Sequence, residues 1–159
     1  RLSVGSHYYS YEQNSSFMLS TQYLFALSGK VAVGAGANYY RLPAVVTVET
    51  PHLIPATSSI TEEELLSLNL IGQFQHFSSK AQLFYGLQVG VQPVDLGGNA
   101  TAFIGLPNLP WLRLELAAHT FEAELPAQIF QYNQLLAEQR TTQKRLFLLS
   151  AGVQITGIF

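Results

Sequence analysis

Arg113 and Glu115 are the two charged residues whose spacing could serve chemistry. They lie two residues apart in a segment that alternates apolar and polar residues, so both side chains project from the same face of a strand. Charged groups inside a fold are tolerated when they are paired and hydrogen-bonded. The pattern therefore predicts an interior ion pair that ties strands together, with a gate or a catalytic pair as the alternative.

Two histidines, His7 and His119, have the same inward parity as this pair. Imidazole groups are well suited to acid–base work near neutral pH. The two would approach each other if their strands flanked a common neighbour. Glu122 has the opposite parity to His119, so the sequence predicts no catalytic set and leaves His119 as the one catalytic candidate.

Metal, cofactor and nucleic-acid chemistry find no support in the sequence. His52 and His76 lack the spacing of metal ligands, and cysteine is absent. Neither a metal nor a cofactor is therefore predicted. The net charge of −2 gives no reason to expect a nucleic-acid partner.

The candidate residues lie on segments that alternate with a period of two, which is typical of β-strands. The sequence predicts eight strands: Leu2–Glu12, Phe17–Leu27, Val31–Tyr40, Leu65–Phe77, Ala81–Val91, Ala100–Leu106, Trp111–Glu124 and Leu146–Phe159. In the seventh, the predicted inward residues are Trp111, Arg113, Glu115, Ala117, His119 and Phe121. A strand as long as the last one, tilted by ~40°, rises roughly 30 Å, close to the apolar band of an outer-membrane barrel.

The composition is unusual for a soluble domain of this size. Of the 159 residues, 48% are hydrophobic and 11% are charged, against about 25% charged residues in ordinary soluble domains. No run of about 18 apolar residues indicates a transmembrane helix. We therefore predict a single domain, residues 1–159, that is an all-β, eight-stranded, antiparallel, up-and-down transmembrane β-barrel.

The predicted connections differ in length according to the end of the barrel at which they lie. Ser28–Lys30, Ser78–Lys80 and Pro107–Pro110 are tight, whereas Arg41–Glu64 and Leu125–Lys144 are long. Outer-membrane barrels have short periplasmic turns and longer extracellular loops. The long connections are therefore expected to face outward from the cell.

A soluble, lipocalin-like binding barrel is the alternative architecture, with an apolar interior and a wet exterior. Among eight basic and ten acidic residues, Arg113 and Glu115 alone fall inside the predicted membrane-spanning parts of the strands, and the rest lie in turns, loops or strand ends. The less apolar strand faces carry Gln, Ser, Asn, Gly and Thr, whereas a solvated exterior would normally carry Lys and Glu. This distribution favours the membrane barrel.

The alternating segments LFYGLQVGVQ and VAVGAGANYY, with the closing SAGVQITGIF, resemble the small eight-stranded outer-membrane barrels of the OmpA/OmpX type. The resemblance is one of pattern and covers nearly the whole chain. It implies insertion among the lipids of the outer membrane of a Gram-negative-type bacterium.

The end of the chain resembles the insertion signal that the barrel-assembly machinery reads in this family. Phe159 is the terminal aromatic residue, with Ile155 and Val153 at alternate positions before it. Gly157 departs from the bulky residue that the family usually has there.

A lipid-modifying barrel is an enzymatic alternative, and outer-membrane lipid A deacylases have a histidine and a serine two residues apart on one face. Phe121 occupies that position after His119, so the motif is absent. An outer-leaflet deacylase or acyltransferase-like barrel that uses His119 remains the enzymatic alternative.

The two long connections are richer in apolar residues than free extracellular loops usually are. These residues are Val45, Val46, Val48 and Ile54 in the first and Ile129, Phe130, Tyr132 and Leu136 in the second. One interpretation is that strands continue beyond the membrane and pack on each other, and the segment Gln128–Gln139 also has helical spacing. The other is a surface that docks another envelope protein. The predicted function is a non-enzymatic accessory or structural barrel that docks such a partner.

Overall fold

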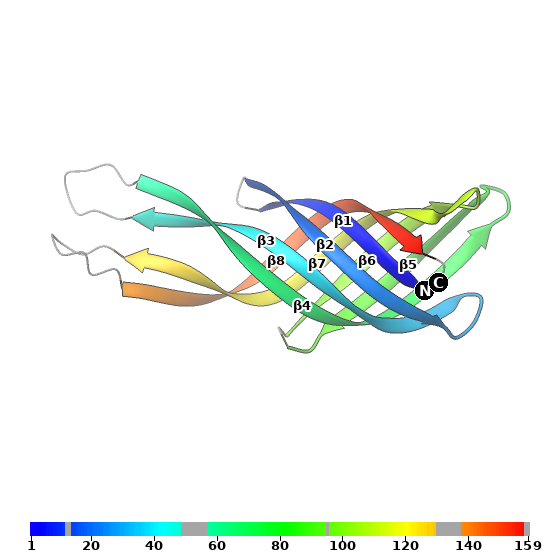
Figure 1. Cartoon of the computed structure of the whole chain (residues 1–159), viewed down its shortest axis with the longest axis horizontal. Coiled ribbons are helices and arrows are strands. Elements are labelled where there is room, and N and C mark those ends of the chain that lie inside the picture. The colour runs from blue at the N-terminus through cyan, green and yellow to red at the C-terminus, as the bar shows by residue number, and fades with distance from the viewer. Residues whose placement is uncertain (12–13, 49–56, 95, 130–137, 158–159) are drawn as a thin grey trace.

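Eight antiparallel strands close into a barrel, in which each strand pairs with the next and β8 pairs with β1 (Figure 1). The computed structural model describes residues 1–11, 14–48, 57–94, 96–129 and 138–157. The strands are β1 (Leu2–Tyr11), β2 (Asn14–Ala26), β3 (Val31–Val48), β4 (Thr57–Ser78), β5 (Leu83–Gln92), β6 (Gly97–Leu106), β7 (Leu109–Ile129) and β8 (Glu138–Gly157). The predicted all-β, eight-stranded antiparallel barrel is therefore confirmed.

The two faces of the sheet are as the alternation predicts. In β8, Phe147 and Leu149 are exposed on the outside, whereas Leu148 and Ser150 are buried inside. Every one of the eight strands exposes bulky apolar side chains on its outer face, and every strand buries at least one polar side chain inside. The barrel thus has an apolar exterior and a largely polar interior. None of the described residues belongs to a helix with the length and apolarity that crossing a membrane requires.

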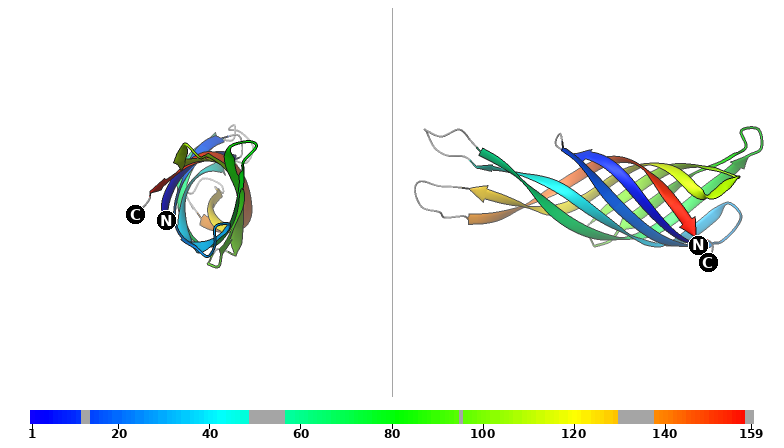
Figure 2. Two further views of the ribbon diagram at one scale, coloured as in Figure 1. Left: turned by 90° about the vertical axis from the view of Figure 1, so that its right-hand side faces the viewer. Right: turned by 45° about the horizontal axis from the view of Figure 1, so that its top comes forward.

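The barrel has two unlike ends. The tight connections after β2, β4 and β6 lie at one end, here called the turn end, where the chain also begins (Figure 2). At the opposite end, here called the hairpin end, β3–β4 and β7–β8 extend well beyond their neighbours (Figure 1). The predicted sorting of connections by length is confirmed at the turn end.

At the hairpin end, the predicted long loops are largely strand. The β3–β4 ladder continues to Val48 opposite Thr57, and the β7–β8 ladder continues to Ile129 opposite Glu138. The β-branched run around Val45 and Val46 favours extended backbone, and antiparallel pairing satisfies its hydrogen bonds without the barrel wall. Helical backbone is thereby excluded for Gln128, Ile129, Glu138 and Gln139, at the two edges of the segment with helical spacing. The other predicted docking residues, Ile54, Phe130, Tyr132 and Leu136, lie outside the described residues.

An apolar cluster fills the interior near the hairpin end. Its members are Tyr9, Met18, Tyr40, Leu42, Phe121, Ala123, Leu146 and Leu148. The rings of Tyr40 on β3 and Phe121 on β7 lie 4.7 Å apart between centroids, so the two extended hairpins meet through their inward faces. The barrel is therefore closed by apolar packing at this end.

Trp111 corrects one prediction about the faces. The alternation of the seventh segment places it inside, but it is 46% exposed. The pairing of β6 with β7 shifts register between Gly105 and Leu106, beside the start of β7. A register irregularity changes the direction of the side chains beyond it, so parity alone misplaces this residue.

Candidate functional site

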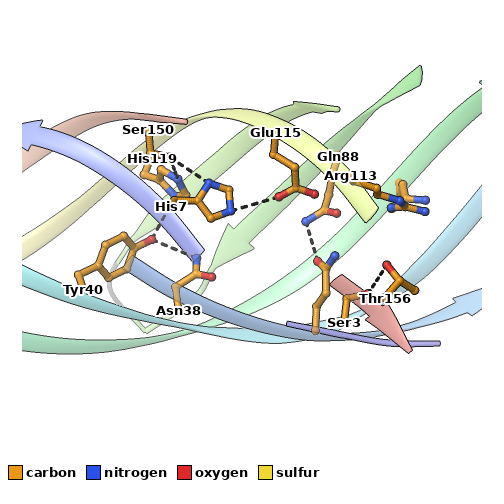
Figure 3. A network of polar contacts seen from close by, with 12 residues as sticks. Ser3, His7, Asn38, Tyr40, Gln88, Arg113, Glu115, His119, Ser150 and Thr156 are labelled. Atoms are coloured by element: carbon orange, nitrogen blue, oxygen red, sulfur yellow. Dashed lines mark hydrogen bonds and ion pairs between the residues drawn. The ribbon is translucent and has the colours of Figure 1, made fainter. Parts of the chain in front are cut away.

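A chain of polar contacts crosses the barrel interior (Figure 3). It starts on β7, passes through β1 and β8, returns to β7 and ends on β3. The Glu115 carboxylate lies 3.2 Å from Nε2 of His7, and Nδ1 of His7 lies 3.4 Å from the Ser150 hydroxyl. The same hydroxyl lies 3.2 Å from Nε2 of His119, whose Nδ1 lies 3.1 Å from the Tyr40 hydroxyl. All five residues are at least nine-tenths buried.

The register of β8 explains why these residues meet. β8 lies between β1 and β7, so His7 and Glu115 both stand opposite Gly152. A Cβ on Gly152 would lie 2.6 Å from Cγ of His7, and glycine therefore leaves the room in which the His7 side chain reaches the carboxylate. The sequence prediction that His7 approaches His119 across a common neighbour is confirmed, with ring centroids 6.5 Å apart.

One arrangement of protons satisfies every contact in this chain. The Tyr40 hydroxyl accepts hydrogen bonds from Nδ2 of Asn38 and Nε2 of Gln92 and donates its own hydrogen to Nδ1 of His119. His119 then donates from Nε2 to Ser150, which donates in turn to Nδ1 of His7. His7 donates from Nε2 to the Glu115 carboxylate. The arrangement keeps both imidazoles neutral and places the negative charge at one end.

Ser150 is the member that sequence reasoning missed. It is separated by 31 residues from His119 and by 143 from His7, so no local motif reveals it. The available signals were its inward parity and the placement of the closing strand between the two histidine-bearing strands. A hydroxyl beside an imidazole that contacts a carboxylate is the composition of a nucleophile–base–acid set.

The surroundings of Ser150 decide what this set can do in the closed barrel. The enclosed space beside His7, His119 and Glu115 measures about 20 Å³, which is room for about one water molecule. An acyl ester is much larger than this space. In this conformation the contacts therefore act as a fully buried polar network that joins β1, β3, β7 and β8.

Arg113 and Glu115 both point inside as predicted, but their contacts go to other residues. Glu115 meets His7, whereas Nη1 of Arg113 donates to Oε1 of Gln73 at 2.9 Å. Two successive inward residues on a strand stand roughly 6.6 Å apart along it, so each reaches a different neighbour. Each residue of the predicted pair therefore has its own direct partner, while the charge of Glu115 still acts on Arg113 at longer range.

Two of the three residues of the predicted assembly signal lie in the described part of the chain. Val153 and Ile155 are exposed on the outside of β8, and Phe159 lies outside the described residues. Across the described part of the chain, no three histidine or acidic side chains gather closely enough to hold a metal ion.

Comparison with protein-family models, curated proteins and solved structures finds no significant match to this chain.

The Ser150 hydroxyl should be important for stability. Ser150→Ala leaves Nε2 of His119 and Nδ1 of His7 without their buried partner, and unmet buried polar groups cost about 1–3 kcal/mol. We expect the free energy of unfolding in urea to fall by about that amount. Ser6→Ala, on the exposed face of β1, is the matched control and should change it little. Equal effects of the two substitutions would contradict a stabilising network.

Proposed function

We propose that the chain is a transmembrane β-barrel of the outer membrane, of the OmpA/OmpX type, without enzymatic activity, that docks another envelope protein at its hairpin end. The observation that carries the membrane part is the inverted polarity of the barrel. Bulky apolar side chains cover the outside of all eight strands, and buried polar side chains occur inside all eight. Water cannot solvate such a wall, whereas hydrocarbon can.

The positions of charged residues support the same proposal. Among the described residues on the outer surface, Lys30 and Lys80 lie in tight connections at the turn end. Arg145 and Glu122 stand opposite each other where the β7–β8 hairpin leaves the wall, 3.5 Å apart between Nη2 and Oε1. Charges gathered at the two ends of an apolar band are typical of a membrane-spanning barrel. A lipocalin-like barrel needs the opposite polarity.

A pore is a poor fit to this interior. Barrels of eight strands have a lumen just wide enough for side chains. The apolar cluster around Tyr40 and Phe121 fills it at the hairpin end, and the network around Ser150 fills it below. We therefore propose no channel function.

The docking part of the proposal rests on the extended hairpins. β4 pairs with β5 from Leu70 onward, so within the described strands its residues 57–69 lie beyond the ladder on that side. β8 likewise pairs with β1 only from Ser150 to Gly157, so the part of β8 before Ser150 lies beyond that ladder. Strand edges beyond a ladder offer backbone donors and acceptors to another chain. A partner that adds a strand there would be recognised by backbone pairing.

The polar network favours a second candidate, an outer-leaflet lipid-modifying enzyme. Ser150 would be its nucleophile and His7 or His119 its base, because both nitrogens lie within 3.4 Å of the hydroxyl. This candidate requires the wall to open, since the adjoining space holds about one water molecule. Loss of an outer-membrane lipid modification in cells carrying Ser150→Ala would favour it over docking.

Leu87→Arg tests the membrane part of the proposal. Leu87 is half exposed near the middle of β5, and an arginine near the bilayer midplane costs about 2–4 kcal/mol. We expect folding into vesicles to be destabilised by about that amount. Val94→Arg, at a 75% exposed position outside the strands, should cost about 0–1 kcal/mol if it lies near the interface. Equal small costs would indicate that water, and not lipid, surrounds the wall.

Phe130→Glu and Leu136→Glu test the docking part. Charges in an apolar contact are costly to bury, so a partner that copurifies from native membranes in mild detergent should be lost from both variants. Lys80→Glu, at the turn end, is the control and should retain it. A monodisperse monomer that copurifies with nothing would contradict docking and leave the membrane proposal untouched.

A further inference from the structure

Arg113 is a buried cation whose contacts are with neutral groups. It is 6% exposed, and its guanidinium donates to Oε1 of Gln73 at 2.9 Å and to Oε1 of Gln75 at 3.5 Å. Its Cζ atom lies 4.6 Å from the ring centroid of Phe103. The nearest carboxylate along the strand, Glu115, contacts His7, and Figure 3 shows Arg113 apart from that chain of contacts.

Such a cation is unusual because a buried charge is costly unless an opposite charge meets it. Amide oxygens and an aromatic face offset part of that cost. These contacts engage Nη1 and Nη2 once each, whereas a guanidinium carries five N–H donors and binds an oxyanion through two parallel hydrogen bonds. Part of the binding capacity of Arg113 is therefore left for another group.

A cavity of about 80 Å³ opens beside Arg113 towards the turn end. Its lining includes Arg113, Arg1 and Gln75, with apolar walls from Phe84, Leu106 and Leu112. A water molecule needs at least about 10–15 Å³ of such space, so the cavity accommodates on the order of five small heavy atoms. A phosphate group is of that size.

Arg1 adds a second positive charge to the same cavity. Arg1 and Arg113 carry like charges and line one small cavity, where apolar walls weaken the screening of their repulsion. An anion between them would convert this repulsion into two attractions. Arg1 is exposed at the mouth, so it can meet an anion that enters from solution.

We propose that this cavity is an oxyanion-binding site that takes a phosphate group, with Arg113 as the buried fork and Arg1 as the cation at the mouth. Gln75 positions Arg113, because its Oε1 accepts from the guanidinium while its Nε2 donates to the carbonyl oxygen of Gly29. The phosphate is either free in solution or part of a lipid headgroup. The inference goes beyond the proposed function and does not depend on it.

The test is a titration of the refolded 159-residue chain with inorganic phosphate, monitored by ³¹P NMR and calorimetry. Arg113→Gln should weaken phosphate binding at least about tenfold, since it removes a charge-assisted fork. Arg113→Lys should bind with intermediate affinity, because the charge stays while the fork is lost. Arg145→Gln, at an exposed arginine of the hairpin end, is the matched control and should bind as the unchanged chain does.

Arg1→Gln keeps the test decisive if Arg113→Gln fails to fold. Its side chain is exposed, so the barrel should form normally while phosphate binds several-fold more weakly. A second titration uses a short-chain phosphatidic acid as competitor. Displacement of phosphate by this lipid would assign the site to headgroups, and retention of phosphate would assign it to the free ion. The proposal would be overturned if phosphate and phosphatidic acid bound equally well to the unchanged chain, Arg113→Gln and Arg1→Gln. It would also be overturned if neither probe bound at all. Both outcomes are independent of the result for Leu87→Arg.

Discussion

The pairing of β8 with β1 is the interaction on which the rest of the barrel depends. It runs from Leu2 opposite Gly157 to Tyr9 opposite Ser150 and joins the two ends of the sheet. Because side chains alternate across a strand, closure gives each strand one face to the interior and one to the surroundings. The polar network exists only through this seam, since β8 carries Ser150 and Gly152 between the strands of His7 and His119.

Closure also separates the interior into zones along the barrel axis. At the hairpin end, Tyr40 and Phe121 belong to an apolar cluster that joins β3 and β7 at the level where the two hairpins leave the barrel wall. Below it, the serine between two histidines is held by contacts from both sides. At the turn end, Arg113 donates to the neutral amide of Gln73 and faces a cavity that Arg1 also lines. The wall is regular, whereas the interior offers different chemistry at each level.

Much of this fold could be predicted from the sequence, because period-two alternation reports directly on the two faces of a strand. The number of strands, the inward parity of His7 and His119 and the tight connections at the turn end follow from local pattern. The hairpin extensions were one of two open interpretations of the long connections, and local pattern could not decide between them, since pairing such as Val48 opposite Thr57 is decided between distant segments. The partners of Glu115 and Arg113, and the outward turn of Trp111, depend on register and on strand order. The alternation of side chains along one strand contains no information on register or on strand order.

The proposal that the apolar wall faces lipid can be tested on the chain's single tryptophan. Trp111 is partly exposed on the outer surface near the turn end, where membrane barrels carry aromatic girdles. Its fluorescence should be measured after refolding into vesicles whose acyl chains carry bromine near the headgroup. We predict emission well below that in the same lipids without bromine, with little further quenching by acrylamide in the water. Equal emission in both lipids, together with strong quenching by acrylamide, would contradict a membrane-embedded wall.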